Sequence, residues 1–247
     1  MALTRRSTIR DVAARVSQAL SDAGITAVLT GGGAVSVYST NRYRSYDIDF
    51  VTAASRRELA AVMSTLGFRP AAGRHFEHPA TPLVVEFVAW PVTVGDEVVS
   101  KWSRMPTPAG TLQILTPIQC VKDRLAAFYH WRDAQSLEQA LLVAGAHRVS
   151  MAELKRWSGV EGHLDDFAEF QRRQPDPRRR VIYGHSMGGA VAVDLAARLH
   201  HGSDYAALVL ESTFTRLPDV AAVAGFWGRI GAMVTTLEFD SLDKIGR

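Results

Sequence analysis

Residues 29–51 of the chain read LTGGGAVSVYSTNRYRSYDIDFV. This stretch connects a short apolar strand to a second apolar strand through a glycine turn and a short apolar helix. Gly31 and Gly32 lie in the turn, where small residues at a helix start let backbone amides approach phosphate groups. The stretch therefore predicts a strand, a phosphate-binding turn and a helix in close succession.

The second strand, predicted over residues 47–51, carries Asp47 and Asp49. Because successive strand residues face opposite sides, both carboxylates project to one face of the sheet. Two adjacent carboxylates repel each other unless a cation lies between them, and Mg²⁺ is commonly held in this way for phosphoryl chemistry. Glu86 lies in an apolar strand predicted over residues 83–88, where an unpaired charge is costly. We predict that strand adjacency brings Glu86 beside the aspartates as a third carboxylate.

Each of these signals has a plainer interpretation when taken alone. An Asp-x-Asp pair is more often a solvated strand face or a turn, and Glu86 could face solvent on an edge strand. A Gly-Gly pair is weaker still. The order and spacing of the turn, the two aspartates and the glutamate together favour a phosphoryl-transfer site.

Predicted helices surround this core. One helix begins at Ser7 as N-cap and ends before Gly24, and the capping box of residues 55–58 begins another. From Thr116 the chain becomes helical, with proline at the first helical position. Three further helices are predicted, over residues 136–144, 150–157 and 164–172.

Residues 29–51 resemble the signature of the polymerase-β-type nucleotidyltransferase superfamily. Residues 122–144, KDRLAAFYHWRDAQSLEQALLVA, resemble the helical region that follows the catalytic sheet in small bacterial members. Over roughly residues 7–172 the chain is most similar to the AbiEii-like group of toxin–antitoxin and abortive-infection systems. The resemblance implies Mg²⁺-dependent transfer of a nucleotidyl group from an NTP to an RNA end, such as a tRNA, or to a protein hydroxyl. It also implies a cognate toxin or antitoxin partner.

The resemblance also implies roles for individual residues. Asp47, Asp49 and Glu86 would be the catalytic, metal-ligating carboxylates, and Gly31 and Gly32 would cradle phosphate. The family pattern more often has Asp in the position of Glu86.

Lys122 and Arg124 begin the helical half, and the resemblance makes them candidates for contacts to the triphosphate. The alternative interpretation is an ordinary solvated first turn of a helix. No sequence feature identifies the base of the NTP or the acceptor.

A second motif follows an expected domain boundary at residue 174, where QPDPRRR ends the helical half. Beyond it, YGHSMGG places Ser186 in a G-x-S-x-G sequence between a predicted strand and a predicted helix. This is the pattern of a nucleophile elbow, in which the backbone N–H of Met187 serves the oxyanion hole. Residues 181–247 resemble part of an α/β-hydrolase, but the acid and histidine of a triad normally follow two further strands. We therefore expect Ser186 to lack its partners.

The expected fold is α+β. Residues 1–174 are predicted as a nucleotidyltransferase-like domain with a small mixed sheet, flanking helices and a helical half. Residues 175–247 are predicted as an incomplete hydrolase-like β-α-β-α unit. Two other functions compete with nucleotidyl transfer: a serine esterase or amidase that uses Ser186, and a non-catalytic interaction protein.

The composition places the chain among globular proteins. It has 247 residues, of which 47% are hydrophobic and 21% charged, and a formal net charge of +3. This charge is too small to indicate nucleic-acid binding by itself. The apolar stretches are shorter than the roughly 18 residues of a membrane-spanning helix. The single Cys120 excludes an internal disulfide and fits a reducing compartment, so we expect a cytoplasmic protein without membrane contact.

Overall fold

The computed structural model describes residues 3–174, 181–199 and 205–211. The chain divides into two compact units, Met1–Gln174 (the first unit) and Pro175–Arg247 (the second unit). Helices and strands mix in both, so the fold is α+β. Among the described helices, none is long and apolar enough to cross a membrane.

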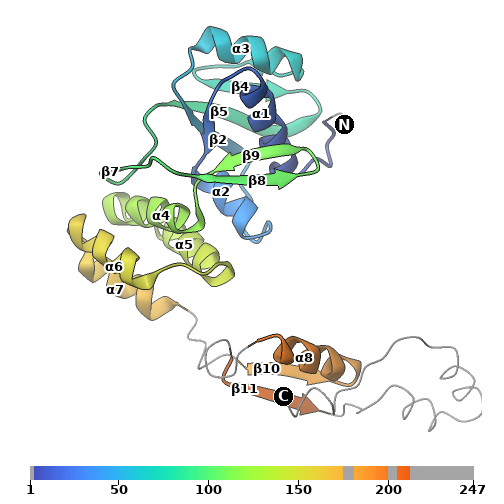
Figure 1. The fold of residues 1–247 in the computed structure, drawn as a ribbon, viewed down its shortest axis with the longest axis vertical. Helices are drawn as coiled ribbons and strands as arrows, with labels where there is room; N and C mark the ends of the chain where they lie inside the picture. Colours follow the sequence, from blue (N-terminus) through green and yellow to red (C-terminus); the bar gives the residue numbers. More distant parts are fainter. Residues whose placement is uncertain (1–2, 175–180, 200–204, 212–247) are drawn as a thin grey trace, which may run out of the picture. The chain divides into compact units, whose positions relative to one another are not determined.

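A seven-stranded mixed sheet forms the centre of the first unit (Figure 1), with strand order β3-β4-β5-β2-β1-β9-β8. In the middle of this sheet β2 pairs antiparallel with β1 and parallel with β5. A separate hairpin consists of β6 and β7. The strands are β1 (Ala27–Leu29), β2 (Asp47–Thr52), β3 (Arg69–Pro70), β4 (His75–His78), β5 (Thr81–Ala89), β6 (Thr93–Val94), β7 (Glu97–Val98), β8 (Ser103–Thr107) and β9 (Gly110–Ile114).

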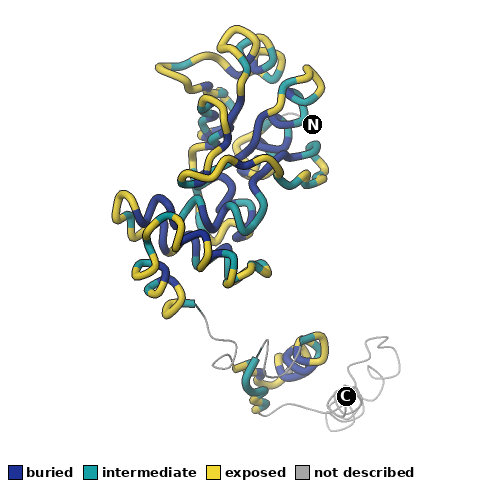
Figure 2. The backbone as a smooth tube through the Cα atoms, turned by 60° about the vertical axis from the view of Figure 1, so that its left-hand side comes forward, coloured by how far each residue is buried: buried dark blue, intermediate teal, exposed yellow. Residues whose placement is uncertain are grey.

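Seven helices accompany this sheet, and four of them stack together beyond one end of it (Figure 1). The short helix α2 contacts both β2 and the helices α4 and α5, so it joins the two parts. Buried residues run through the strands and the helices packed on them as one core (Figure 2). The helices are α1 (Ile9–Asp22), α2 (Gly31–Tyr38), α3 (Arg56–Thr65), α4 (Pro117–Trp131), α5 (Ala134–Ala146), α6 (Met151–Val160) and α7 (Leu164–Arg173).

Most predicted helix starts are confirmed, with small shifts at α1 and at α5, which begins at Ala134 instead of residue 136. The capping boxes at Ser55 and Thr116 are both present. The N-cap of α1 is Thr8, not the predicted Ser7, because Thr8 exchanges two hydrogen bonds with Asp11 in a capping box. At α6 the Ser150 side chain accepts from the backbone of Glu153, but the Glu153 carboxylate bonds elsewhere.

The region between residues 68 and 115 contains more strands than the sequence predicted. The predicted strand over residues 83–88 is present as the longer β5. The structure adds β3, β4 and β6 to β9, which have two to five residues each. Strands this short carry little periodic signal, since their existence depends on the neighbours with which they pair.

The second unit contains a parallel pair of strands and one helix in its described part. Strands β10 (Val181–His185) and β11 (Ala207–Glu211) pair in parallel, and α8 (Met187–Ala197) packs on them. Large apolar side chains remain exposed here, including Val181 and Tyr183, as expected of an incomplete hydrolase sheet. The second helix of the predicted β-α-β-α unit lies outside the described residues.

A buried lysine joins the β6–β7 hairpin to the helical part of the first unit. The Lys122 ammonium lies 2.8 Å from Glu97 and 2.9 Å from Glu153, and only 4% of its side chain is exposed. It also lies 5.7 Å from the centre of the Trp157 ring. One cation therefore connects β7, α4 and α6.

Replacing Lys122 with Met is expected to lower the free energy of unfolding by about 1–3 kcal/mol, since two carboxylates lose their shared partner. Urea denaturation followed by tryptophan fluorescence measures the change. Lys101→Met at an exposed position is the control and should cost less than about 0.5 kcal/mol. Equal effects of the two variants would contradict a structural role for Lys122.

Candidate functional site

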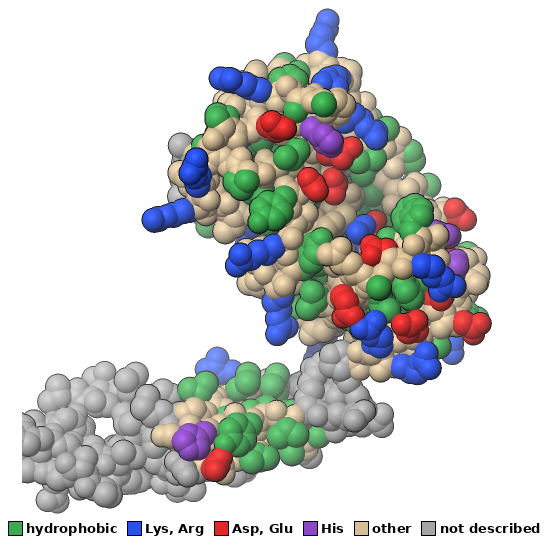
Figure 3. Space-filling model, turned by 180° about the vertical axis from the view of Figure 1, so that it is seen from behind, with side chains coloured by type: hydrophobic (Ala, Val, Ile, Leu, Met, Phe, Trp, Pro, Cys, Tyr) green, Lys and Arg blue, Asp and Glu red, His purple; other side chains and the backbone are tan. Residues whose placement is uncertain are grey.

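The parallel pairing of β2 with β5 brings two of the predicted carboxylates side by side. Asp49 and Glu86 are direct partners in the register, so their side chains share one face of the sheet. Asp47 lies two residues earlier on the same face, while Ile48 and Phe50 are fully buried on the opposite face. Figure 3 shows acidic side chains and a histidine gathered on one face of the first unit. We call Asp47, Asp49 and Glu86 the acidic cluster.

The electrostatics of the acidic cluster are unfavourable for a buried charge. Burial raises the pKa of Asp49 from 3.8 to about 6, and the nearby carboxylates of Glu86 and Asp47 add to this increase. The Arg124 guanidinium acts in the opposite direction and lowers the pKa of Asp49. Perturbed carboxylates of this kind are typical of functional sites.

The glycine turn lies directly against the acidic cluster. Gly31 has a φ of +61°, and a Cβ added there would lie 2.8 Å from Oδ2 of Asp49. The backbone N–H of Thr30, the N-cap of α2, donates to the Asp49 carbonyl at 2.9 Å. Glycine at position 31 therefore leaves room for the Asp49 carboxylate, which a Cβ would crowd. At Gly32 an added Cβ would meet Ser45 and Tyr43 at 3.3 Å.

Glu86 has two basic neighbours that the sequence analysis missed. Nε2 of His75 lies 3.2 Å from one carboxylate oxygen, and Nε of Arg74 lies 3.8 Å from the other. His75 reaches this place because β4 pairs antiparallel with β5 and places it opposite Glu86. The only sequence signal was a histidine shortly before an apolar strand, which does not reveal the pairing.

Arg124 lies close enough to the acidic cluster to lower the pKa of Asp49. Its guanidinium donates to Asp123 at 2.6 and 2.9 Å and to Gln139 at 3.4 Å. Asp123 also contributes to the raised pKa of Asp49 and was not singled out from the sequence.

Lys122 requires a correction. The sequence offered two interpretations, a triphosphate contact or a solvated helix turn, but the structure buries its ammonium between Glu97 and Glu153. Since both carboxylates already neutralise this charge, Lys122 is a structural residue in this fold.

The acidic cluster has donors that suit a hard divalent cation, although it is not a preformed metal centre. Within the described ranges, no three or more His, Cys, Asp or Glu side chains are arranged to hold a metal ion. One reason is that Glu86 is turned toward His75 and Arg74. Carboxylate oxygens are nevertheless the ligands that Mg²⁺ prefers. A cation would also relieve the repulsion that raises the pKa of Asp49, so these residues fit the group.

Ser186 has the backbone geometry of a nucleophile elbow. It lies between β10 and α8 with φ 52° and ψ −127°, in the strained region expected of this turn. Gly184 is required there, because a Cβ would lie 2.6 Å from Cα of Gly189. In the described part of this unit, the Glu211 carboxylate accepts a hydrogen bond from Tyr183, and Asp194 pairs with Arg198. His200 and His201 lie outside the described residues.

Comparisons with known proteins found two kinds of similarity. A family model described as Serine aminopeptidase, S33 matches residues 147–239. A search of curated proteins found no match. The chain is similar to a solved antigenic nucleotidyltransferase-like protein from Paracoccidioides brasiliensis, with a TM-score of 0.50 and 14% identity over 71% of this chain and 92% of that one. The chain therefore combines a nucleotidyltransferase-like fold with a hydrolase-like C-terminal region.

Two solved structures of the antibiotic-resistance factor ANT(2'')-Ia match less well. Its solution structure has a TM-score of 0.37 and 14% identity, over 67% of this chain and 91% of that chain. Its complex with adenylyl-2''-tobramycin has a TM-score of 0.35 and 15% identity, over 68% of this chain and 98% of that chain. The more specific assignment to the AbiEii-like group stays a prediction.

Gly31→Ala is expected to destabilise the protein more than Gly24→Ala. Both glycines have positive φ, +61° and +74°, so both variants carry a backbone cost of about 1–2 kcal/mol. Only Gly31 would also push against Asp49, whereas a Cβ at Gly24 meets nothing within 4 Å. Urea denaturation of the two variants measures the difference. Equal decreases in the free energy of unfolding of the two variants would show that the Asp49 carboxylate does not need the space that Gly31 leaves.

Asp49→Asn is expected to stabilise the protein at pH 8 but not at pH 4. Because the folded pKa of about 6 exceeds the ordinary value of 3.8, the folded state binds the extra proton between these pH values. The free energy of unfolding therefore falls as the pH rises through this window. By pH 8 the loss is about 1–3 kcal/mol, and asparagine, which cannot ionise, avoids it.

Denaturation at the two pH values, with exposed Asp96→Asn as the control, tests this prediction. The control should change stability by less than about 0.5 kcal/mol at either pH. A variant no more stable than the parent protein at pH 8 would contradict the electrostatic description of the acidic cluster.

Proposed function

We propose that the first unit transfers a nucleotidyl group from an NTP to a hydroxyl acceptor, an RNA end or a protein side chain. The observation that carries the proposal is the acidic cluster, which lies against Gly31 at the N-terminus of α2. The nucleotidyltransferase-like fold is consistent with this reaction but does not establish it, because one fold supports many functions.

Asp47, Asp49 and Glu86 would hold Mg²⁺ through their carboxylate oxygens. When bound, Mg²⁺ would neutralise charge on the triphosphate and make the attacking hydroxyl more acidic. At neutral pH Asp49 is ionised, because its pKa of about 6 lies below that pH. The site is thus anionic under the conditions in which a divalent cation would bind.

The positive groups beside the acidic cluster would position the triphosphate. Gly31 and Gly32 begin α2, so their backbone N–H groups and the helix dipole attract phosphate oxygens. Arg124 adds a positive charge near Asp49, which its ion pair with Asp123 partly neutralises. Since Asp123 and Gln139 accept bonds from its guanidinium, Arg124 is held in place before a nucleotide binds.

The chemical step is a displacement at the α-phosphorus. The acceptor oxygen forms a new bond to this phosphorus while the bond to the departing pyrophosphate breaks. Glu86, beside Asp49, would help to hold the cation, and the proton of the acceptor hydroxyl would leave to solvent. The resemblance to the AbiEii-like group extends the proposal to a toxin–antitoxin or phage-defence role in the cytoplasm, with a cognate partner.

Incubation of the full chain with each α-labelled NTP, with and without Mg²⁺ and total tRNA, tests the proposed transfer. Label is expected on RNA or protein only with Mg²⁺. Asp47→Asn and Asp49→Asn should each reduce transfer at least about 100-fold, because a carboxylate ligand is lost. Asp96→Asn, at an exposed turn, should retain it.

Two outcomes would contradict the proposal. Transfer that survives both substitutions in the acidic cluster would place the chemistry elsewhere. Absence of transfer with every NTP and acceptor would favour the non-catalytic interaction protein, unless p-nitrophenyl ester hydrolysis sensitive to Ser186→Ala appeared instead.

A further inference from the structure

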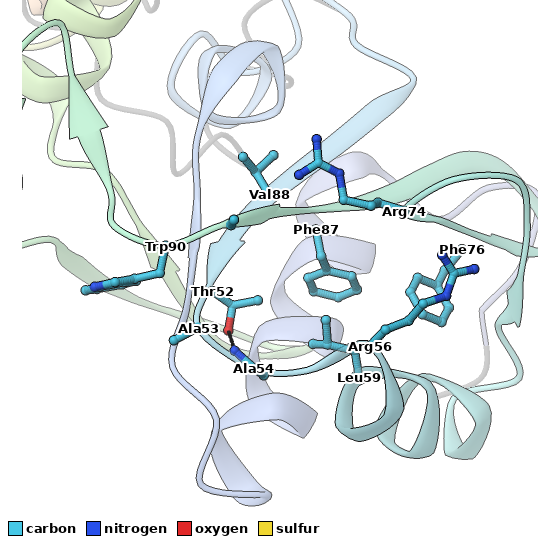
Figure 4. Close-up of a pocket in the computed structure, with 11 residues that line it drawn as sticks. Thr52, Ala53, Ala54, Arg56, Leu59, Arg74, Phe76, Phe87, Val88 and Trp90 are labelled. Carbon is cyan, nitrogen blue, oxygen red and sulfur yellow. Dashed lines mark hydrogen bonds between the residues drawn. The ribbon is translucent and has the colours of Figure 1, made fainter.

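A cavity of about 430 Å³ opens in the first unit between α3 and the ends of β2 and β5. This size is in the range of sites for small molecules. Its floor is apolar, and Leu59, Phe76 and Phe87 in it are almost fully buried. Trp90 forms a further wall with 40% of its surface exposed (Figure 4). We call this cavity the α3 pocket.

The α3 pocket is distinct from the acidic cluster. Phe87 follows Glu86 on β5, and Thr52 lies three residues after Asp49 on β2. Because side chains alternate along a strand, Phe87 and Thr52 face the side of the sheet opposite to both carboxylates. A ligand in the α3 pocket would therefore not occupy the place proposed for the triphosphate.

The Arg56 guanidinium gives the α3 pocket its charge. Arg56 donates to the backbone carbonyls of Gly73 and Ala71, the latter at 3.3 Å. No ion pair to Arg56 occurs within the described part of the chain, and its other N–H groups remain as donors. Arg74 also lines the pocket, but its guanidinium is turned to the other side of β5, toward Glu86 at 3.8 Å (Figure 4). Arg56 can therefore attract an anion at this wall.

The aromatic residues favour a flat ring. Trp90 is held edge-on against Trp102, with ring centres 6.0 Å apart, and Trp102 donates to Gln113 at 2.9 Å. Its indole is thus fixed at the rim, where it can stack on a ligand ring. A neighbouring cavity of about 520 Å³ shares Trp90 but has Glu58 as its charged residue. The charges therefore place an anionic group in the α3 pocket and not in the neighbouring cavity.

We propose that the α3 pocket binds a small molecule that carries an anionic group on an aromatic ring. The ring lies between Trp90 and the apolar floor, and the carboxylate or phosphate group contacts Arg56. This binding goes beyond the proposed transfer and requires neither an NTP nor Mg²⁺.

Titration of the full chain with phenyl phosphate and with benzoate, measured by isothermal calorimetry, tests the proposal and distinguishes the two anions. Saturable binding at one site is expected for at least one of them. Phenol, which lacks the charge, and inorganic phosphate, which lacks the ring, should each bind at least tenfold more weakly.

Arg56→Gln should weaken binding of the anionic ring at least tenfold and leave phenol binding within twofold. This comparison separates a charge contact from a collapsed pocket, since a collapse would weaken both ligands. Arg57→Gln is the matched control, because Arg57 is the next residue on α3 and does not line the pocket. It should bind the anionic ring within twofold of the parent protein.

Three results would overturn the proposal: no saturable binding of either anionic ring, inorganic phosphate binding as tightly as phenyl phosphate, or equal losses in Arg56→Gln and Arg57→Gln. Asp49→Asn should bind the anionic ring as the parent protein does. Failure of nucleotidyl transfer would therefore leave this proposal standing, and failure of ring binding would leave the transfer proposal standing.

Discussion

The parallel pairing of β2 with β5 is the constraint on which the site depends. The register places Asp49 beside Glu86, and the same alternation buries Phe50 beside Phe87 on the other face, with ring centres 6.0 Å apart. A slip of one residue would bury the carboxylates and expose the aromatic rings. The apolar face of these two strands therefore determines, through their register, where the acidic face lies.

The protein tolerates an unfavourable concentration of negative charge at this face. Burial and neighbouring carboxylates raise the pKa of Asp49, and Arg124 only partly offsets them. Arg74 and His75 lie beside the Glu86 carboxylate, as Arg124 lies near Asp49. Natural folds retain such arrangements mainly where the charge is used, which makes the cluster a functional candidate beyond its sequence motif.

The second unit shows how a local motif can form without its usual surroundings. The elbow at Ser186 needs a strand, a turn that tolerates positive φ and close helix packing at Gly184, and all three are present. These requirements are local, so a parallel pair of strands and one helix suffice to satisfy them. A catalytic triad needs side chains from distant segments, which the elbow geometry does not supply.

The sequence by itself determined the helices with strong caps, the apolar strands and the alternation that puts Asp47 and Asp49 on one face. These follow from local periodicity and short-range hydrogen bonds. Only the tertiary structure decided the different roles of Lys122 and Arg124. Two residues apart on a helix, they point to nearly opposite sides: Lys122 pairs with Glu153, whereas Arg124 bonds Asp123 and Gln139 and lowers the pKa of Asp49. The packing of α4 determines which charged groups lie near Lys122 and which lie near Arg124. No local sequence pattern encodes that packing.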